Sequence, residues 1–367
     1  MPSGWITRRT LKNGSYAYLA SWRDSANRKH SKQFELRRDA QNHLDAMRTE
    51  VKTGMFIPAK TGRTTLDAWW DEWWVTQVQL RGSTEARDSA SYKNHVKPTF
   101  GDVPLQRIQH HDVATWVATM VASGTGPDVV HKAHQVLSKA LRAAVKSHKL
   151  RSNVAEGIDL PRIAKPKIRV FTPTEISALA LAIDPRYRHF PTVGAYTGLR
   201  VGEMFALVWD NVDLVARRMS VEGTVVEVHG RLTVNEPKTN AGKRVVPLPQ
   251  VVIDALRAAN PKPARDALVF PNSVGTHTRT NGFRQRIWVP ALQAANIEPR
   301  PVHCLRHTAI SFWLASGATV VEAKQWAGHE SVSTILDRYG HLLTSQTVQR
   351  MNALDRLAAS SHGGAGC

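Results

Sequence analysis

The chain has 367 residues, of which 42% are hydrophobic and 22% are charged, a composition of folded globular proteins that excludes a largely disordered chain. Its 49 Lys and Arg against 30 Asp and Glu give a formal net charge of +19, which favours a polyanionic partner such as nucleic acid but identifies no chemistry. This length exceeds what one hydrophobic core usually organises, so two or three domains are expected.

The N-terminus and the cysteines bear on location. The segment MPSGWITRRTLKNGSYAY lacks the apolar stretch of a signal peptide, and no run of about 18 apolar residues suggests a membrane span. Cys304 and Cys367 stand 63 residues apart without a paired spacing, which suits a reducing compartment. We therefore expect a soluble cytoplasmic protein that is not associated with a membrane.

Residues 1–63 are predicted to form a small β-sheet followed by one helix. Polar and apolar residues alternate from Tyr16 to Trp22, and apolar residues recur at helical spacing from Arg38 to Lys52. This segment contains 13 Lys or Arg and 5 Asp or Glu, a balance of +8. It is predicted to be a separate DNA-binding domain, with a solvated basic surface without a partner as the alternative.

Residues 64–165 are predicted to form an all-helical domain, which begins after the break at Pro58 and Gly62. Four tryptophans at helical spacing, between Trp69 and Trp74, are expected to pack in its core rather than to stack on bases. His131 and His134 are three residues apart on a later helix. Because no third ligand is near, a solvated or phosphate-contacting face is favoured over a metal site.

An extended basic linker, DLPRIAKPKIRVFTP, leads into a third domain over residues 166–367. Helices are expected there together with a small antiparallel sheet, and the segments 232–237 and 244–249 are read as one hairpin. Asn240 to Gly242 supply the turn chemistry of that hairpin. The fold class is therefore a multidomain α+β protein with a mainly helical C-terminal domain.

Four local motifs in this third domain contain residue types suited to phosphate chemistry. Each is weak alone, since an arginine and a glutamate three apart on a helix most often form a surface ion pair. Their order along the chain is specific. They are Arg200 and Glu203 in TGLRVGEMFALVW, Lys238 in the hairpin, His303 and Arg306 in HCLRH, and His329 and Tyr339 in WAGHESVSTILDRYGHL.

In order and local context, these residues resemble the catalytic set of the tyrosine recombinases, the integrases of temperate phages and mobile elements. The family patterns TGLR.GE, H.LRH and GH.S...T...Y are legible over roughly residues 170–345. The two preceding domains resemble, with weaker motifs, the arm-site and core-site DNA-binding domains of the family. Ala327 stands where many members have Leu, a departure outside the catalytic set.

The resemblance implies a site-specific recombinase that cleaves and rejoins DNA through a covalent 3′-phosphotyrosyl link to Tyr339, and so integrates or excises mobile DNA. It implies that the two arginines bind the phosphate, that His303 is the general base, that Lys238 is the general acid and that His329 donates a hydrogen bond to the phosphate. Glu203 is expected to support Arg200 or His303 without touching DNA.

No cofactor, metal or ATP is expected. The implied partners are double-stranded DNA attachment sites of the core and arm types, a homotetramer on DNA, a host DNA-bending protein and a recombination directionality factor. An amphipathic helix is predicted over residues 344–358. The helix packs either on its own catalytic domain or on a neighbouring subunit, and the sequence leaves both open. The attachment-site sequence and the preference for integration or excision are also open at this point.

Three other functions are compatible with single features of the sequence. A zinc hydrolase using His303 and His307 is disfavoured because Cys304 occupies the position where such a helix carries glutamate. An ATP-driven motor is disfavoured because the pattern GxxxxGK[ST] does not occur. A non-catalytic architectural DNA-binding protein or inactivated recombinase is the remaining alternative, and the complete catalytic set argues against it.

Overall fold

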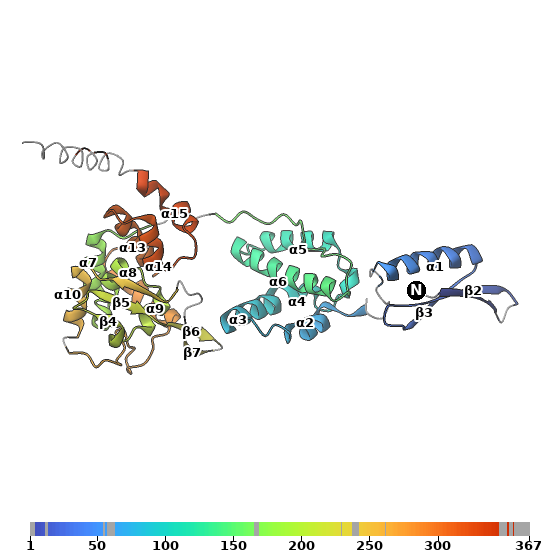
Figure 1. The fold of residues 1–367 in the computed structure, drawn as a ribbon, viewed down its shortest axis with the longest axis horizontal. Helices are drawn as coiled ribbons and strands as arrows, with labels where there is room; N and C mark the ends of the chain where they lie inside the picture. The colour runs from blue at the N-terminus through green and yellow to red at the C-terminus, as the bar shows by residue number, and fades with distance from the viewer. Residues whose placement is uncertain are drawn as a thin grey trace, which may run out of the picture. The chain divides into compact units, whose positions relative to one another are not determined.

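The computed structural model describes residues 4–11, 14–53, 56, 63–164, 169–228, 230–236, 242–260, 262–344, 351 and 355. The chain divides into two compact units, residues 1–164 and 165–367 (Figure 1). Three separate clusters of buried apolar side chains occur, two in the first unit and one in the second. Within the described ranges, every helix is too short or too polar to span a bilayer.

The first unit begins with the predicted small sheet and helix. The sheet is antiparallel, with β2 between β1 and β3. Trp22 of the sheet and Leu44 of the helix are buried in a shared core. The bounds are Gly4–Thr10 (β1), Tyr16–Arg23 (β2), Lys29–Phe34 (β3) and Arg37–Lys52 (α1).

The rest of the first unit is helical, as predicted. Its helices are Leu66–Trp74 (α2), Gly82–Ser91 (α3), Lys97–Phe100 (α4), His110–Ala122 (α5) and Pro127–Lys146 (α6), with a π-helical turn at Tyr92–Val96. Trp69 and Trp70 are buried, and the ring of Trp70 stacks on Tyr92 at 3.8 Å. The Trp69 indole donates a hydrogen bond to the Ala140 carbonyl at 2.8 Å. The predicted core role is confirmed for Trp69 and Trp70, whereas Trp73 and Trp74 are partly buried and pack against the same core.

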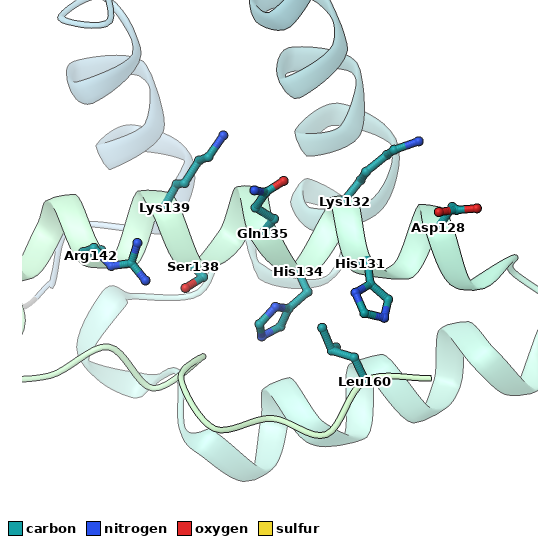
Figure 2. Close-up of a pocket in the computed structure, with 9 residues that line it drawn as sticks. All are labelled: Asp128, His131, Lys132, His134, Gln135, Ser138, Lys139, Arg142 and Leu160. Carbon is teal, nitrogen blue, oxygen red and sulfur yellow. The ribbon is translucent and has the colours of Figure 1, made fainter. Parts of the chain in front are cut away.

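The paired histidines of α6 both contact the chain that follows this helix. Figure 2 shows His131 and His134 pointing toward the segment that carries Leu160. The His131 Nε2 donates to the Pro161 carbonyl and the His134 Nε2 to the Ala155 carbonyl, each at 2.8 Å. Because a carbonyl only accepts, each ring uses its N–H to fix the chain after α6. Each histidine therefore has a structural contact that the sequence did not indicate, and a contact with phosphate stays a prediction.

Replacing Trp69 tests the helical core. Trp69→Ala removes a side chain that is 3% exposed, together with its hydrogen bond to Ala140, and should lower the free energy of unfolding of this part by about 3–5 kcal/mol. Urea denaturation followed by circular dichroism measures the loss. The control Val78→Ala, at a side chain 85% exposed, should stay within about 0.5 kcal/mol of the parent. Equal stability of the two variants would contradict the core placement.

The second unit places nine helices around two small antiparallel sheets, counted over its described residues. The helices are Pro173–Ala182 (α7), Phe190–Thr197 (α8), Val201–Ala206 (α9), Gln250–Ala259 (α10), Thr280–Phe283 (α11), Val289–Ala294 (α12), Cys304–Ala315 (α13), Val320–Ala327 (α14) and Ser333–Thr344 (α15). The strands are Val212–Asp213 (β4), Arg218–Val221 (β5), Thr224–Val228 (β6), Arg231–Asn235 (β7) and Arg244–Pro247 (β8).

The predicted hairpin between segments 232–237 and 244–249 is wrong. Among the described residues, β7 pairs with β6 and β8 pairs with β5. Only residues 229 and 230 separate β6 from β7, and Gly230 has φ +75°. A glycine with a positive φ suits a tight connection between adjacent strands. β7 therefore pairs with β6, which directly precedes it in the chain, and not with β8.

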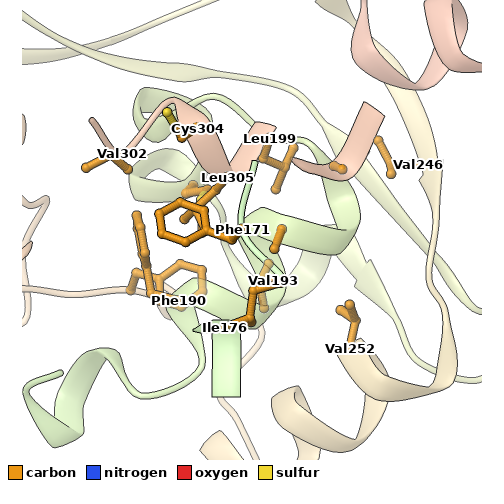
Figure 3. Close-up of a cluster of buried hydrophobic side chains, with 14 of the residues drawn as sticks. Phe171, Ile176, Phe190, Val193, Leu199, Val246, Val252, Val302, Cys304 and Leu305 are labelled. Atoms are coloured by element: carbon orange, nitrogen blue, oxygen red, sulfur yellow. The ribbon is translucent and has the colours of Figure 1, made fainter. Parts of the chain in front are cut away.

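The core of the second unit forms where α8 and α13 pack against each other (Figure 3). Gly194 on α8 allows the close approach, because a Cβ there would lie 2.8 Å from a methyl carbon of Leu305 on α13. Phe190 and Leu305 are buried in this cluster. The packing fixes α13, which carries the HCLRH motif, against the loop that follows α8.

Candidate active site

Arg200 is positioned by the end of one helix and the start of the next. α8 ends at Gly198, whose φ of +64° is left-handed, and a Cβ there would lie 2.7 Å from the ring of Trp313. Only glycine suits that turn. Arg200 is then the N-cap residue of α9, and its side chain keeps 41% of its surface accessible. The TGLR motif therefore delivers one arginine to the surface of a rigid core.

A buried carboxylate holds this arginine. The Glu203 carboxylate accepts from the Arg200 guanidinium at 2.8 Å and from the Arg200 backbone N–H at 2.8 Å. The same carboxylate accepts two hydrogen bonds from Arg244 of β8, at 3.1 and 2.8 Å. Glu203 thus supports Arg200, one of the two roles expected for it, and a second arginine joins the site.

The first turn of α13 carries the next three residues. His303 is the N-cap residue, and its ring meets the ring of His307 edge to face at 4.9 Å. Arg306 is 2% exposed and donates to the carbonyls of Gly198, at 2.8 Å, and Ala327, at 2.5 Å. These two contacts use two of the five N–H groups of the guanidinium.

The end of α14 connects the arginines. Three successive carbonyls accept from three different guanidiniums: Trp326 from Arg244 at 2.6 Å, Ala327 from Arg306 at 2.5 Å, and Gly328 from Arg200 at 3.2 Å. The last carbonyls of a helix have no partner within the helix and carry its partial negative charge. They are therefore suited to hold cations that would otherwise repel one another.

His329 and Tyr339 complete the cluster. His329 follows Gly328, which ends α14 with φ +64°, and among the residues that the structure describes its buried Nδ1 has no hydrogen-bond partner. Tyr339 lies on α15, is 1% exposed, and its hydroxyl makes a short hydrogen bond with Nδ1 of His307. The hydroxyl of the predicted nucleophile thus contacts a histidine that the sequence analysis had considered only as a zinc ligand.

The electrostatics of the cluster favour neutral histidines and a neutral tyrosine. Burial and the neighbouring cations lower the pKa of each of His303, His307 and His329 to about 4, and burial raises the pKa of Tyr339 to about 12. Burial and the charge of Arg200 lower the pKa of Arg306 to about 9, which still leaves that guanidinium charged at neutral pH.

Glu203 is ionised despite its burial. Burial by itself would raise the pKa of Glu203, but the guanidiniums of Arg244 and Arg200 hold it below its usual value. A carboxyl whose pKa is depressed on folding stabilises the protein above its unfolded pKa and loses that contribution as the pH falls through the folded pKa. The Glu203 contribution is therefore complete at neutral pH and is lost in acid.

The structure brings Arg200, His303, Arg306, His329 and Tyr339 into one connected region, with Glu203 beneath them. Lys238, the sixth predicted catalytic residue, lies outside the described residues. No group of three or more His, Cys, Asp or Glu side chains with metal-binding geometry occurs in the part of the chain that the structure describes.

Sequence reasoning missed Arg244 and the contact of His307. Alternation along β8 offered a signal for the first, because Arg244 shares the inward face of the strand with Val246 and is 8% exposed. A cation on an inward face needs hydrogen-bond acceptors around it, and an ionised carboxylate is the strongest of these. His307 offered a weaker signal, since it is four residues after His303 and so lies on the same face of the helix.

Comparisons with known proteins agree with this geometry. The model of the phage integrase family matches residues 169–346, and a phage integrase N-terminal SAM-like domain matches residues 65–121. The phiRv2 prophage integrase of Mycobacterium tuberculosis is 28% identical over 89% of this chain and 88% of its own length. The ICEBs1 integrase of Bacillus subtilis is 24% identical over 72% of this chain and 75% of its own.

Solved structures show the same fold. A Tn1549 transposon integrase in complex with circular intermediate DNA aligns with a TM-score of 0.68 at 18% identity, over 79% of this chain and 99% of that one. A lambda integrase dimer bound to a core site aligns with a TM-score of 0.60 at 16% identity, over 89% and 93%. The family matches over residues 65–121 and 169–346 identify a tyrosine-type site-specific recombinase. The chain belongs to the phage integrase family.

The Glu203–Arg244 pair gives a test of the site's scaffold. Arg244→Ala leaves the Glu203 carboxylate buried beside Arg200 alone and should lower the free energy of unfolding by about 3–5 kcal/mol at pH 7. The matched control is Arg265→Ala, which removes an exposed pair with Asp210 and should cost less than about 1 kcal/mol. Thermal or urea unfolding measures both. Equal losses would show that the Arg244 pair is no more structural than a surface pair.

Proposed function

We propose that this recombinase cleaves and rejoins DNA strands through a covalent bond between Tyr339 and a 3′-phosphate, and that it integrates and excises a mobile element. One observation carries the assignment of residues. Arg306 and Arg200 are held by successive carbonyls at the end of α14, and α15, which bears Tyr339, packs on α13 and α14. A phosphate at the two guanidiniums would lie close to the phenol.

The arginines suit an anionic transition state. A phosphodiester gains negative charge as it is attacked, and a guanidinium donates two parallel hydrogen bonds to its non-bridging oxygens. Arg200 is accessible and Arg306 is fixed by two backbone carbonyls. Donors held in place before the substrate arrives need no reorganisation during the reaction. His329 would add a further hydrogen bond to the phosphate.

The tyrosine supplies the covalent step. Attack of its oxygen on phosphorus conserves the energy of the phosphodiester in a phosphotyrosine, so that rejoining needs no ATP. His303 is the general base that the resemblance implies; it contacts His307, which in turn contacts Tyr339. Lys238 is proposed to protonate the leaving 5′-oxygen. Glu203 supports Arg200 from beneath.

The proposed domains are residues 1–63 for arm-type sites, 64–165 for core-type sites and 166–367 for catalysis. The basic balance of the first segment and the SAM-like match in the second support the division. A lambda integrase tetramer is known on a Holliday junction, and we propose that four copies of this chain also assemble on two duplexes. A host DNA-bending protein and a directionality factor are proposed as further partners.

Replacing the nucleophile is the direct test. Tyr339→Phe keeps the buried ring but removes the attacking oxygen, so DNA binding should persist and covalent adducts should vanish. The substrate is a set of nicked duplexes with a randomised core, from which the wild-type protein selects its own site by covalent capture. Adducts are read on denaturing gels.

The control for this test is Tyr196→Phe. Tyr196 is half-buried, and its ring centroid lies 5.3 Å from that of Phe312. It is outside the proposed catalytic set, and its variant should cleave at the parental rate. An adduct that survives Tyr339→Phe would show that another residue is the nucleophile. Loss of the adduct with retained gel-shift binding would exclude a merely architectural DNA-binding role for the wild type.

The division of binding roles is tested by deletion. A chain that begins at residue 64 should still bind and cleave the captured core duplex but lose binding to arm-type DNA. Full-length binding should fall by roughly 10³–10⁵ between 50 and 200 mM salt if about 6–10 phosphates are neutralised. Gel shifts across a salt series measure both effects. Core binding that is lost with residues 1–63 would contradict the partition.

A further inference from the structure

The hydroxyl of Tyr339 has a specific partner in the DNA-free protein. Nδ1 of His307 makes a short hydrogen bond with it. Among the residues that the structure describes, the hydroxyl makes no other hydrogen bond. The ring centroids of the two residues are 6.0 Å apart. Neither the resemblance nor the comparisons assign His307 a role.

The direction of this hydrogen bond follows from burial. Tyr339 is 1% exposed, so a phenolic proton without an acceptor would be costly. If Nδ1 carried a proton it would donate to the phenol oxygen, and the phenolic proton would be left without an acceptor. The satisfied arrangement has Tyr339 donating to an unprotonated Nδ1, with the imidazole proton on Nε2.

The surroundings keep His307 neutral and therefore able to accept a proton. His303, from its own helix side, and Tyr339, from α15, contact the ring. The charges of Arg338 and Arg306 act on it as well. Burial together with Arg338 and Arg306 lowers the pKa of His307 to about 4, whereas burial raises that of Tyr339 to about 12. Before DNA binds, the proton therefore stays on the phenol and the hydrogen bond joins two neutral groups.

We infer that His307 is a further catalytic residue, which takes the proton of Tyr339 directly during cleavage and returns it during rejoining; this rests on the proposed function. The Oη–H bond breaks and its proton moves to Nδ1, while Oη forms a bond to phosphorus. The bond from phosphorus to the 5′-oxygen breaks, and that oxygen receives a proton from the general acid, proposed as Lys238. His303 then acts through its contact with His307 and not on the phenol itself.

The tautomer can be tested without DNA. In full-length protein with ¹⁵N-labelled histidine rings, the signals of His307 are assigned by their loss in His307→Gln. The inference expects a proton on Nε2 and an Nδ1 shift that changes in Tyr339→Phe. A proton on Nδ1 would overturn it, because a donor to the phenol oxygen cannot receive the phenolic proton.

Cleavage kinetics provide the second test. Glutamine at position 307 can hydrogen-bond to the phenol but cannot take up its proton, so His307→Gln should slow adduct formation on the captured core duplex by about 10²–10⁴-fold. Gel-shift affinity and thermal unfolding should stay near the parental values. The matched control is His277→Gln, a half-buried histidine that contacts the Phe205 carbonyl at 3.0 Å and should leave cleavage unchanged.

A fluorinated tyrosine at position 339 separates a chemical role from a structural one. Its phenol is more acidic and depends less on a proton acceptor, so it should shrink the deficit of His307→Gln by about tenfold or more. A deficit that does not change with phenol acidity would make His307 a structural residue only. Parental cleavage by His307→Gln would overturn this inference alone, whereas the lack of any Tyr339-dependent adduct in the wild type would overturn the proposed function as well.

Discussion

The end of α14 is the constraint on which the site depends. Three guanidiniums from three different elements bind successive carbonyls there. Like charges gathered in a partly buried environment repel one another strongly. The carbonyls of residues 326–328 offset the repulsion because the final turn of a helix presents unpaired acceptors with partial negative charge. Gly328 makes this possible, since its φ of +64° ends the helix and leaves these carbonyls to the arginines. The order Gly-His in the sequence is thus a geometric requirement: the glycine turns the chain and His329 follows directly.

Glu203 supplies the single carboxylate that the described contacts place among these guanidiniums. It accepts hydrogen bonds from Arg200 and Arg244 and so links β8 to α9. The carbonyls at the end of α14 bind the same two arginines. One carboxylate against Arg200, Arg244 and Arg306 leaves the region with excess positive charge and with N–H donors that no carbonyl occupies. In the proposed reaction, the phosphodiester would supply this missing negative charge. The stability of the scaffold and its affinity for DNA therefore have the same origin, because the protein neutralises its arginines only in part.

Local patterns were enough to predict most helices and the catalytic motifs, because period and order are properties of the sequence alone. The tryptophans of α2 and the turn before Arg200 illustrate this. Three features depended on contacts between distant segments and were missed. β7 pairs with β6 because a two-residue turn intervenes; His131 and His134 bond to carbonyls about 20 to 30 residues away; and Arg244 is a partner of Glu203, 41 residues apart. The alternation of β8 and the short connection at Gly230 point to a buried arginine and to a turn, but neither pattern names the distant partner.

The burial of Tyr339 has an energetic consequence for the reaction. Ile335 and Tyr339 are 0% and 1% exposed and lie four residues apart on α15, so the same stripe that anchors this helix to the core also carries the proposed nucleophile. Burying each of these two side chains contributes about 1.5–3 kcal/mol, so together they favour the docked helix by roughly 10²- to 10⁴-fold. That preference holds the hydroxyl against His307 in the DNA-free protein. The docking of α15 is therefore what places the proposed nucleophile.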